Sequence, residues 1–327
     1  MTILVTGGLG YIGSHTVVEL LNNNFEVVII DDLSNTERFI LKNIEEIAGK
    51  KPIFYPFDLK RKELLKQVFD AHKIEGCIHF AAYKAVGESQ VKPIDYYENN
   101  LFSLINLLQE MKERNISNFI FSSSCTVYGQ ADTMPIDENT PLKLPESSYG
   151  KTKQMGEEIL KDYATAHQKK VTLLRYFNPI GAHPSAKLGE LPIGIPNNLV
   201  PYVMQTAAGV REKLSVWGND YPTEDGTAIR DYIYVVDLAK AHVKALQKLL
   251  KMSSDTQIDI YNLGTGKGSS VLEVVHAFEK ANDVAVPYQI CERRAGDITI
   301  AYANADKAEK ELGWKSETSL EEALRTV

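Results

Sequence analysis

Tyr149 and Lys153 are the residues of this sequence whose types and spacing point most directly to chemistry. Positions i and i+4 share one face of a helix, so the phenol and the ammonium can face the same crevice. A free phenol, with a pKa of about 10, is a poor base at neutral pH. A cation about 4 Å away at an effective dielectric of about 20 contributes about 4 kcal/mol, which corresponds to roughly three pKa units. The pair therefore predicts a tyrosine that takes a proton from a substrate hydroxyl group near neutral pH.

Ser124, which follows the apolar run 118–123, is the third candidate for this chemistry. Its hydroxyl could hydrogen-bond the same substrate hydroxyl and relay its proton. Each candidate also has a plainer interpretation. Tyr149 and Lys153 could form one face of an amphipathic helix, and Ser124 could satisfy backbone groups at a strand end. The elements that surround these residues favour the chemical interpretation.

A glycine-rich turn opens the chain. The apolar run 2–6 stops at Gly7, and Gly10 and Gly13 complete the spacing G-x-x-G-x-x-G before a helical stretch. Such glycines let the chain turn sharply, let the backbone approach a pyrophosphate and let the helix pack on the strand. The free N–H groups at the helix start then bind the phosphates. An ordinary tight turn has the same glycines, so the motif depends on its context.

That context is an acidic residue after the second apolar run. Asp31 and Asp32 end the run 27–30, and Asp31 comes eighteen residues after Gly13. A carboxylate at this place accepts hydrogen bonds from an adenosine ribose and repels a 2′-phosphate. The sequence therefore predicts NAD, rather than NADP, as the cofactor. The positive nicotinamide of NAD⁺ is expected to help Lys153 make Tyr149 a usable general base near neutral pH.

Apolar runs alternate with helical patterns through the first half of the chain, which predicts an α/β fold of the Rossmann type. The expected strands are 2–6, 26–31, 53–57, 76–81, 118–123 and 171–175, and the expected helices are 11–22, 37–48, 61–72, 93–113 and 149–168. In such a doubly wound parallel sheet, ligands bind outside the carboxyl ends of the strands. We predict an NAD-binding domain over 1–176 and a smaller α/β substrate-binding domain over 177–327, with segments that return to the first sheet. Helices are expected there near 197–209, 235–250, 269–282 and 304–312.

Composition narrows the class of protein. The chain has 327 residues, of which 44% are hydrophobic and 24% charged, with a net charge of -7. An acidic balance argues against a nucleic-acid partner, and neither a membrane-spanning stretch nor a signal-peptide pattern is visible. The three cysteines are far apart and the seven histidines show no metal-ligand spacing, so we expect no metal. These features predict a cytoplasmic enzyme.

Several motifs together resemble the extended short-chain dehydrogenase/reductase family. They are the turn 6–13, the serines 122–124 and the Tyr149-x-x-x-Lys153 pair. Further segments are similar to the members of that family that epimerise sugar nucleotides, and the similarity covers essentially the whole chain. Those segments are 84–89, 175–179, 194–199, 218–223, 230–232 and 293–297.

The resemblance implies reversible epimerisation of UDP-glucose and UDP-galactose at C4, through a 4-keto intermediate and with tightly bound NAD. It also implies a homodimer formed through a helix-rich face. Tyr149, Lys153 and Ser124 would be the catalytic residues. The glycine turn and the resemblance together place the following residues at NAD: Gly7, Gly10, Tyr11, Ile12, Gly13, Asp31, Asp32, Leu33, Ser34, Asn35, Thr36, Asp58, Leu59, Phe80, Ala81, Ala82, Tyr83, Lys84, Asn99, Ser122 and Phe177.

The resemblance also places a set of residues at the UDP-sugar: Asn178, Asn198, Leu199, Val216, Arg230, Arg294, Asp297 and Ala301. Arginines suit a pyrophosphate and amides suit a uracil edge. Ala301 is expected where the family places a side chain against the sugar, and its small size would admit UDP-N-acetylglucosamine. Tyr302 is adjacent and could fill that space instead.

Related enzymes define the alternatives. Sugar-nucleotide dehydratases of the same family have an acid pair near the position of Cys125 and Thr126, where this chain has no carboxylate, so elimination of water is disfavoured. The second hypothesis for an enzyme is an epimerase of UDP-uronic acids or N-acetylated sugars. The hypothesis without catalysis is an NAD-binding regulator, which would usually lack Tyr149 or Lys153.

Overall fold

A seven-stranded sheet forms the base of the molecule. The structure, a computed structural model, describes residues 1–294 and 297–327; Gly296 of the motif 293–297 lies outside them. The strands run in the order β11-β6-β5-β4-β1-β2-β3, and all neighbours pair in parallel. The prediction of a Rossmann-type parallel sheet is therefore confirmed. Its strands are β1 (Thr2–Thr6), β2 (Glu26–Ile30), β3 (Ile53–Tyr55), β4 (Ile74–His79), β5 (Asn118–Ser122), β6 (Lys170–Tyr176) and β11 (Gln257–Leu263).

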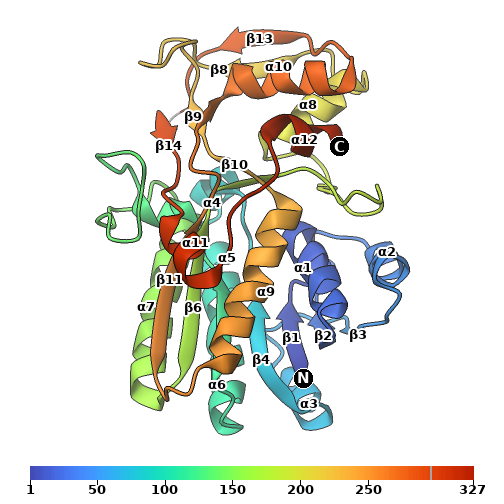
Figure 1. Cartoon of the computed structure of the whole chain (residues 1–327), viewed down its shortest axis with the longest axis vertical. Coiled ribbons are helices and arrows are strands. Elements are labelled where there is room, and N and C mark those ends of the chain that lie inside the picture. Colours follow the sequence, from blue (N-terminus) through green and yellow to red (C-terminus); the bar gives the residue numbers. More distant parts are fainter. Residues whose placement is uncertain (295–296) are drawn as a thin grey trace.

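Helices cover both faces of this sheet, because successive residues of a strand point to opposite sides. Ile3 and Val5 belong to the hydrophobic core on one face, and Leu4, between them, belongs to the core on the other. Figure 1 shows α1 and α9 on the same side of the sheet. The first face is covered by α1 (Tyr11–Asn22), α2 (Phe39–Ala48) and α9 (Val235–Lys251), and the second by α3 (Lys62–Ala71), α6 (Ser103–Glu113) and α7 (Ser148–His167).

Helix α7 lies unusually close to strand β5. A Cβ atom on Gly156 would lie 2.8 Å from Cζ of Phe121, closer than real Cβ contacts come. The N-terminal end of the helix is fixed by Ser147, whose hydroxyl accepts a hydrogen bond from the Gly150 N–H at 3.1 Å. Such caps contribute about 1 kcal/mol. The close approach therefore places the first two turns of α7 directly at the end of β5.

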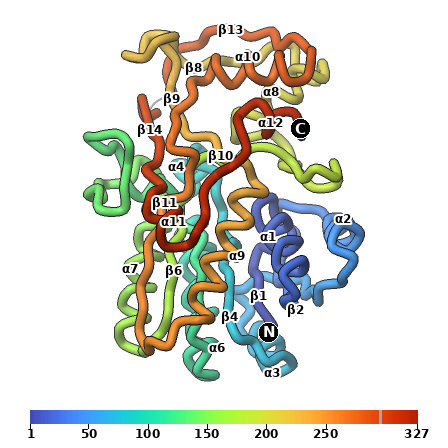
Figure 2. Tube along the Cα trace, in the orientation of Figure 1, coloured from blue at the N-terminus to red at the C-terminus, as the bar shows by residue number. Residues whose placement is uncertain are grey.

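A second layer of structure lies above the carboxyl ends of the large sheet (Figures 1 and 2). Its own hydrophobic core includes Val203, Tyr232 and Phe278. It contains the small sheets β10-β7, β12-β9-β14 and β13-β8. Its elements are β7 (Asn178–Ile180), α8 (Leu199–Ala207), β8 (Leu214–Trp217), β9 (Ile229–Arg230), β10 (Tyr232–Tyr234), β12 (Ser269–Ser270), α10 (Val271–Asn282), β13 (Tyr288–Cys291), β14 (Ile300–Ala301) and α12 (Leu320–Arg325). Helix α11 (Asp306–Leu312) packs instead beside α9 and β11, and its Ala308 belongs to the core of the large sheet.

The chain crosses between the two layers more than once. Helix α9 packs on the first sheet and β11 pairs with β6, although both follow residue 176. The two layers are therefore not divided by a single boundary in the chain, and the domain boundary at residue 176 stays a prediction. Among the described residues, no helix is both long and apolar enough to span a bilayer.

The expected helix 93–113 is interrupted. It begins as α5 (Pro93–Tyr97), passes through one π-helical segment, η1 (Glu98–Phe102), and continues as α6. Such bulges are frequent at functional sites. Here the bulge contains Asn99 and Asn100, both buried, and the Asn100 side chain donates to the Tyr83 carbonyl at 3.1 Å and to the Thr152 hydroxyl at 2.9 Å. The bulge thus links the segment after β4 to α7.

Candidate active site

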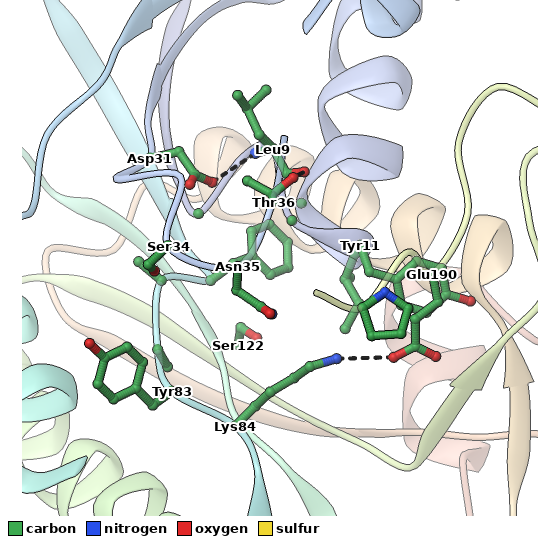
Figure 3. A pocket seen from close by; sticks show the side chains of 18 of the residues that line it. Leu9, Tyr11, Asp31, Ser34, Asn35, Thr36, Tyr83, Lys84, Ser122 and Glu190 are labelled. Atoms are coloured by element: carbon green, nitrogen blue, oxygen red, sulfur yellow. Dashed lines mark hydrogen bonds and ion pairs between the residues drawn. The ribbon is translucent and has the colours of Figure 1, made fainter. Parts of the chain in front are cut away.

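One cleft lies at the carboxyl ends of the strands of the large sheet, where Figure 3 shows side chains from several of these segments. Ser124, Tyr149 and Lys153 all line it, as do Asn178 and Asn198 of the predicted UDP-sugar set. Every residue predicted at NAD also lines it, except Leu33, whose side chain packs against a hydrophobic core. The structure therefore brings together the residues on which the predicted chemistry depends.

The glycine turn has the geometry that a pyrophosphate requires. Gly7 has a φ of +67°, and a Cβ on it would lie 2.7 Å from the Ala81 nitrogen. A Cβ on Gly13 would lie 2.1 Å from the Gly7 oxygen. Helix α1 begins at Tyr11 directly after Gly10, and the first N–H groups of a helix have no partners within it. The turn thus presents backbone N–H donors around a space that a side chain at Gly7 or Gly13 would occupy. This arrangement fits a dinucleotide phosphate.

Asp31 is positioned beside this cradle. Its carboxylate accepts a hydrogen bond from the Leu9 N–H at 3.0 Å, drawn in Figure 3, and another from the Leu33 N–H at 3.0 Å. Burial raises the pKa of Asp31, and the two backbone donors act against that rise. The Leu33 backbone therefore supports the predicted ribose ligand, although the Leu33 side chain lies outside the cleft. A carboxylate so fixed has lone pairs left for a ribose hydroxyl.

Tyr149 and Lys153 lie on the buried face of α7, as the spacing predicted, but their electrostatics differ from the expectation. Burial raises the pKa of Tyr149, and a hydrogen bond with Ser124 offsets only part of that rise. The Lys153 ammonium donates to the Ser122 carbonyl at 2.6 Å and lies 5.9 Å from the centroid of the Tyr149 ring. The charge of Lys153 alone therefore does not lower the pKa of Tyr149, and the predicted base depends on the further positive charge of an oxidised nicotinamide.

Burial also lowers the pKa of Lys153 to about 7. A group with this pKa is only about half protonated near neutral pH. The phenol and the ammonium thus both lie in an environment that disfavours their charged forms. The Ser124 hydroxyl, which also accepts hydrogen bonds from the Thr126 N–H at 3.2 Å and the Thr126 hydroxyl at 3.0 Å, is fixed beside them.

The other residues predicted at the UDP-sugar lie in the upper layer. Asp297 accepts a hydrogen bond from Arg230 at 2.6 Å and one from Arg294 at 3.2 Å, so one carboxylate holds two of the expected cations. Ala301 of β14 pairs with Arg230 of β9. Leu199 packs against the upper core, and Val216 is completely buried in it. The Val216 side chain fills this core, so a contact with the substrate would come from its backbone, and the assignment of Val216 to the UDP-sugar stays a prediction.

Comparison with known proteins identifies the family. A family model described as GDP-mannose 4,6 dehydratase matches residues 4–327. The chain is 54% identical to a UDP-glucose 4-epimerase from Bacillus subtilis, over 98% of this chain and 94% of that protein. It is 51% identical to the one from Haemophilus influenzae, over 99% of this chain and 96% of that protein. The chain belongs to the UDP-glucose 4-epimerase family.

Solved structures agree with this membership. The UDP-glucose 4-epimerase from Bifidobacterium longum, crystallised with NAD⁺ and UDP, has a TM-score of 0.96 at 48% identity and covers 100% of this chain, with 96% of that chain covered. The UDP-Glc/GlcNAc 4-epimerase from Campylobacter jejuni has a TM-score of 0.85 at 35% identity, over 99% of this chain and 97% of that chain. The resemblance is confirmed, and the chain is an NAD-dependent epimerase.

The local sequence after β5 distinguishes an epimerase of this family from the dehydratase after which the family model is described. Ser124 is followed by the 3₁₀ segment η2 (Cys125–Tyr128), and Cys125 and Thr126 both line the cleft. Burial raises the pKa of the Cys125 thiol to about 12, so it stays protonated at neutral pH. Neither residue supplies the carboxylate that expulsion of water from a ketone would need.

Glu190 is a residue of the cleft that the sequence did not single out. One of its carboxylate oxygens accepts a hydrogen bond from Lys84 at 3.1 Å, shown in Figure 3, and another from Asn198 at 2.5 Å. It therefore joins a residue predicted at NAD to one predicted at the UDP-sugar. No motif in the sequence identified Glu190. A single glutamate in the proline- and glycine-rich stretch 179–201 has the pattern of a solvated loop residue.

Proposed function

We propose that this chain interconverts UDP-glucose and UDP-galactose by epimerisation at C4 and holds NAD in the cleft beside Tyr149. One observation carries the proposal. The same cleft is lined by the glycine turn, by Asp31 and by the group of Ser124, Tyr149 and Lys153. A dinucleotide held by the first two would present its reactive end to the third, as ligands of such sheets do.

NAD supplies the hydride acceptor and donor for C4 of the sugar. Tyr149 takes the proton of the C4 hydroxyl as that carbon is oxidised, and it returns a proton to the same oxygen when the ketone is reduced. Ser124 lines the cleft together with Tyr149 and orients the oxygen that reacts. Lys153, fixed on the Ser122 carbonyl, contributes positive charge next to the phenol.

Inversion at C4 requires that the sugar present both faces while the nucleotide stays bound. We assign the anchoring of UDP to Asn178 and Asn198 in the cleft and to Arg230 and Arg294 above it. Asp297 orients both arginines, and guanidinium groups bind pyrophosphate oxygens well. With UDP held at this end, the 4-keto sugar turns about its bond to the pyrophosphate and is reduced from the other side.

The test is conversion of UDP-galactose to UDP-glucose by purified protein without added NAD. Product would support epimerisation with a resident cofactor, whereas stoichiometric consumption of added NAD would identify a dehydrogenase. Tyr149→Phe should abolish turnover while NAD stays bound. Tyr163→Phe is the matched control, because Tyr163 lies on the same helix and its buried hydroxyl has no partner among the described residues. Full turnover by Tyr149→Phe would remove the phenol from the mechanism.

A second substrate is supported by the surroundings of Ala301. Its side chain lies in a small cluster with Phe177 and Val127, next to the catalytic strand end. The neighbouring Tyr302 points elsewhere, since a Cβ on Gly268 would lie 3.3 Å from its ring. We therefore expect turnover of UDP-N-acetylglucosamine as well. Ala301→Tyr should lower this activity relative to that on UDP-glucose, and an unchanged ratio would refute the assignment.

The homodimer is proposed from an exposed apolar surface. Ile94, Phe102 and Ile105, from α5, η1 and α6, are 71%, 55% and 36% exposed. Met155 of α7 is 45% exposed, and α7 packs beside α5 and η1. Large exposed apolar surfaces mark interaction sites. Phe102→Glu should convert the dimer to a monomer in light scattering after size exclusion, and an unchanged mass would exclude this surface.

We also place the enzyme in the cytoplasm. Cys77, Cys125 and Cys291 are free, and free thiols suit a reducing compartment. Cell fractionation tests this, and recovery of the protein in an extracellular fraction would contradict it.

A further inference from the structure

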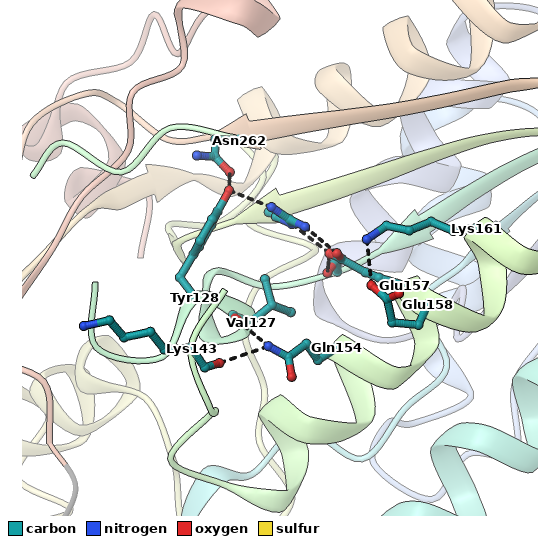
Figure 4. Close-up of polar contacts among 10 residues, drawn as sticks. Val127, Tyr128, Lys143, Gln154, Glu157, Glu158, Lys161 and Asn262 are labelled. Atoms are coloured by element: carbon teal, nitrogen blue, oxygen red, sulfur yellow. Dashed lines mark hydrogen bonds and ion pairs between the residues drawn. The ribbon is translucent and has the colours of Figure 1, made fainter. Parts of the chain in front are cut away.

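Glu157 lies one turn after Lys153 on the buried face of α7 and is completely buried, with 0% exposure. Its two carboxylate oxygens accept hydrogen bonds from Arg175 of β6, at 2.8 and 2.5 Å. One of them also accepts the Ser123 hydroxyl at 2.6 Å. Figure 4 shows Glu157 inside the molecule, whereas its neighbour Glu158 pairs with Lys161 at 2.7 Å on the exposed side of the helix.

The network continues away from the cleft. Arg175 donates to the Tyr128 hydroxyl at 3.0 Å, and that hydroxyl donates to Asn262 at 2.7 Å. The guanidinium is therefore held between Glu157 and Tyr128. A bidentate pair of this kind fixes the orientation of the carboxylate. The carboxylate therefore holds a negative charge one helical turn after Lys153, on the same face of α7.

The same carboxylate fixes the strand end on which the reaction depends. Ser123, which Glu157 holds, lies between Ser122, whose carbonyl accepts a hydrogen bond from Lys153, and Ser124, which lines the cleft with Tyr149. We propose that Glu157 is a positioning residue of the reaction, whose buried carboxylate favours the charged form of Lys153 and holds the 122–124 strand end in register with it. This inference rests on the proposed function.

Among the described groups that face Lys153, Glu157 is the acidic one, although its ion pair is with Arg175. On its own helix these groups are Tyr149 and Glu157. From β5 it faces the Phe121 ring, with 4.9 Å from Nζ to the centroid, and from β4 it faces His79, which burial and the nearby ammonium keep neutral, with its pKa lowered to about 3.

From β6 the neighbouring groups are Tyr176, hydrogen-bonded with Ser122 at 2.6 Å, and the guanidinium of Arg175. Burial raises the pKa of Tyr176 to about 12, so this phenol is neutral at neutral pH. Burial lowers the pKa of Lys153, and Glu157 acts against that fall. Among the described residues around the ammonium, Glu157 is therefore the group that carries negative charge.

A purely structural role for Glu157 makes a different prediction. A buried ion pair can often be replaced by apolar residues without loss of stability, whereas removal of one partner alone is strongly destabilising. Glu157→Gln by itself therefore confounds charge with folding. The double variant Glu157→Gln/Arg175→Met removes the carboxylate and the cation together. This double variant retains much of the packing but leaves Lys153 without the Glu157 carboxylate.

The experiment is the dependence of kcat on pH with UDP-galactose, for the holoenzyme and its variants. Loss of a nearby charge shifts a pKa by about one unit or more. We expect the rise of kcat with pH to move upward by about one unit in Glu157→Gln and in the double variant, with about tenfold lower kcat at neutral pH. Glu158→Gln, the exposed neighbour, should have the profile of the unmodified enzyme.

A second readout needs no turnover. The ultraviolet absorbance of tyrosinate is titrated in each protein and in the same protein with Tyr149→Phe, and the difference reports ionisation of Tyr149. Removal of the carboxylate should move this ionisation to higher pH. An equal loss of kcat at all pH values, or an unshifted titration in the double variant, would overturn the proposal. Failure of the proposed function is a separate result: unmodified protein would not convert UDP-galactose, while the titration would still report on Glu157.

Discussion

Replacement of Gly13 by alanine tests the glycine cradle most sharply. The new Cβ would lie 2.1 Å from the Gly7 oxygen and 3.0 Å from both the Gly7 carbonyl carbon and the Gly8 Cα. All three atoms belong to backbone, so no side chain can rotate to make room. The oxygen also accepts the Gly10 N–H at 3.2 Å. The start of α1 must therefore move away from the turn.

The size of the effect follows from this geometry. Contacts closer than 3.0 Å are essentially never observed, so the oxygen and the new Cβ must separate by at least 0.9 Å, the difference between 3.0 and 2.1 Å. Overpacking of this kind costs about 1–3 kcal/mol, and loss of the Gly10 hydrogen bond adds about 1 kcal/mol. Displacement of the helix N-terminus from the phosphates should weaken NAD binding by about ten- to a hundredfold, which is about 1.4–2.8 kcal/mol.

The assay compares NAD content after purification, NAD affinity by calorimetry and the free energy of unfolding in urea. Gly87→Ala is the control, because a Cβ at Gly87 meets nothing within 4 Å and the residue lies in helix α4 (Val86–Val91). That variant should bind NAD normally and be more stable by about 0.5–1 kcal/mol. Unaltered NAD affinity in Gly13→Ala would refute the assignment of this turn to the pyrophosphate.

Three further predictions address charge. Asp31→Asn should lower the preference for NAD over NADP at least about tenfold, because the repulsion of a 2′-phosphate is lost; paired binding titrations with the two dinucleotides check this. Glu190→Gln should strengthen binding of UDP several-fold at low salt, because it removes a negative charge from a cleft that receives phosphates; an affinity equal to that of the unmodified protein would contradict this. Burial lowers the pKa of His15, His79 and His242 to about 4, 3 and 4. Below about pH 6.5 the unfolded chain therefore binds protons that the folded chain does not, and the free energy of unfolding decreases as the pH is lowered. Between about pH 7.5 and 5.5 the loss should be about 1.4 kcal/mol for each histidine and about 4 kcal/mol in total, measured by urea unfolding at both values.

The parts of the site that could be predicted from sequence are those set by local stereochemistry. The spacing of Gly7, Gly10 and Gly13 is readable because each glycine meets a steric requirement within the same turn. The pairing of Tyr149 with Lys153 is readable because helical periodicity alone puts both on one face. The parallel pairing of the strands is readable because apolar runs alternate with helical patterns along the chain.

Strand β11 could not be predicted because its apolar run is broken by a charge. Asp259 lies in the middle of the strand and is buried, with 6% exposure. In isolation it indicates a solvated segment. It is tolerated because Lys248 of α9 reaches its carboxylate at 3.1 Å, a partner eleven positions earlier that only the packing of α9 on the sheet brings near. Sequence patterns report a residue's own preference and do not report a tertiary partner that offsets the cost of burial.

The same limit applies to the electrostatics of the catalytic pair. The sequence places a cation near Tyr149, but the sign of each pKa shift depends on burial, which raises the pKa of Tyr149 and lowers that of Lys153. Both shifts oppose the phenolate–ammonium pair, so the protein by itself stabilises neither charge. Tyr149 can therefore act as a base only when further positive charge enters the cleft beside it, and an oxidised nicotinamide carries such charge. Proton abstraction is then coupled to the presence of a hydride acceptor, and Glu157 sets how much of the remaining charge Lys153 supplies.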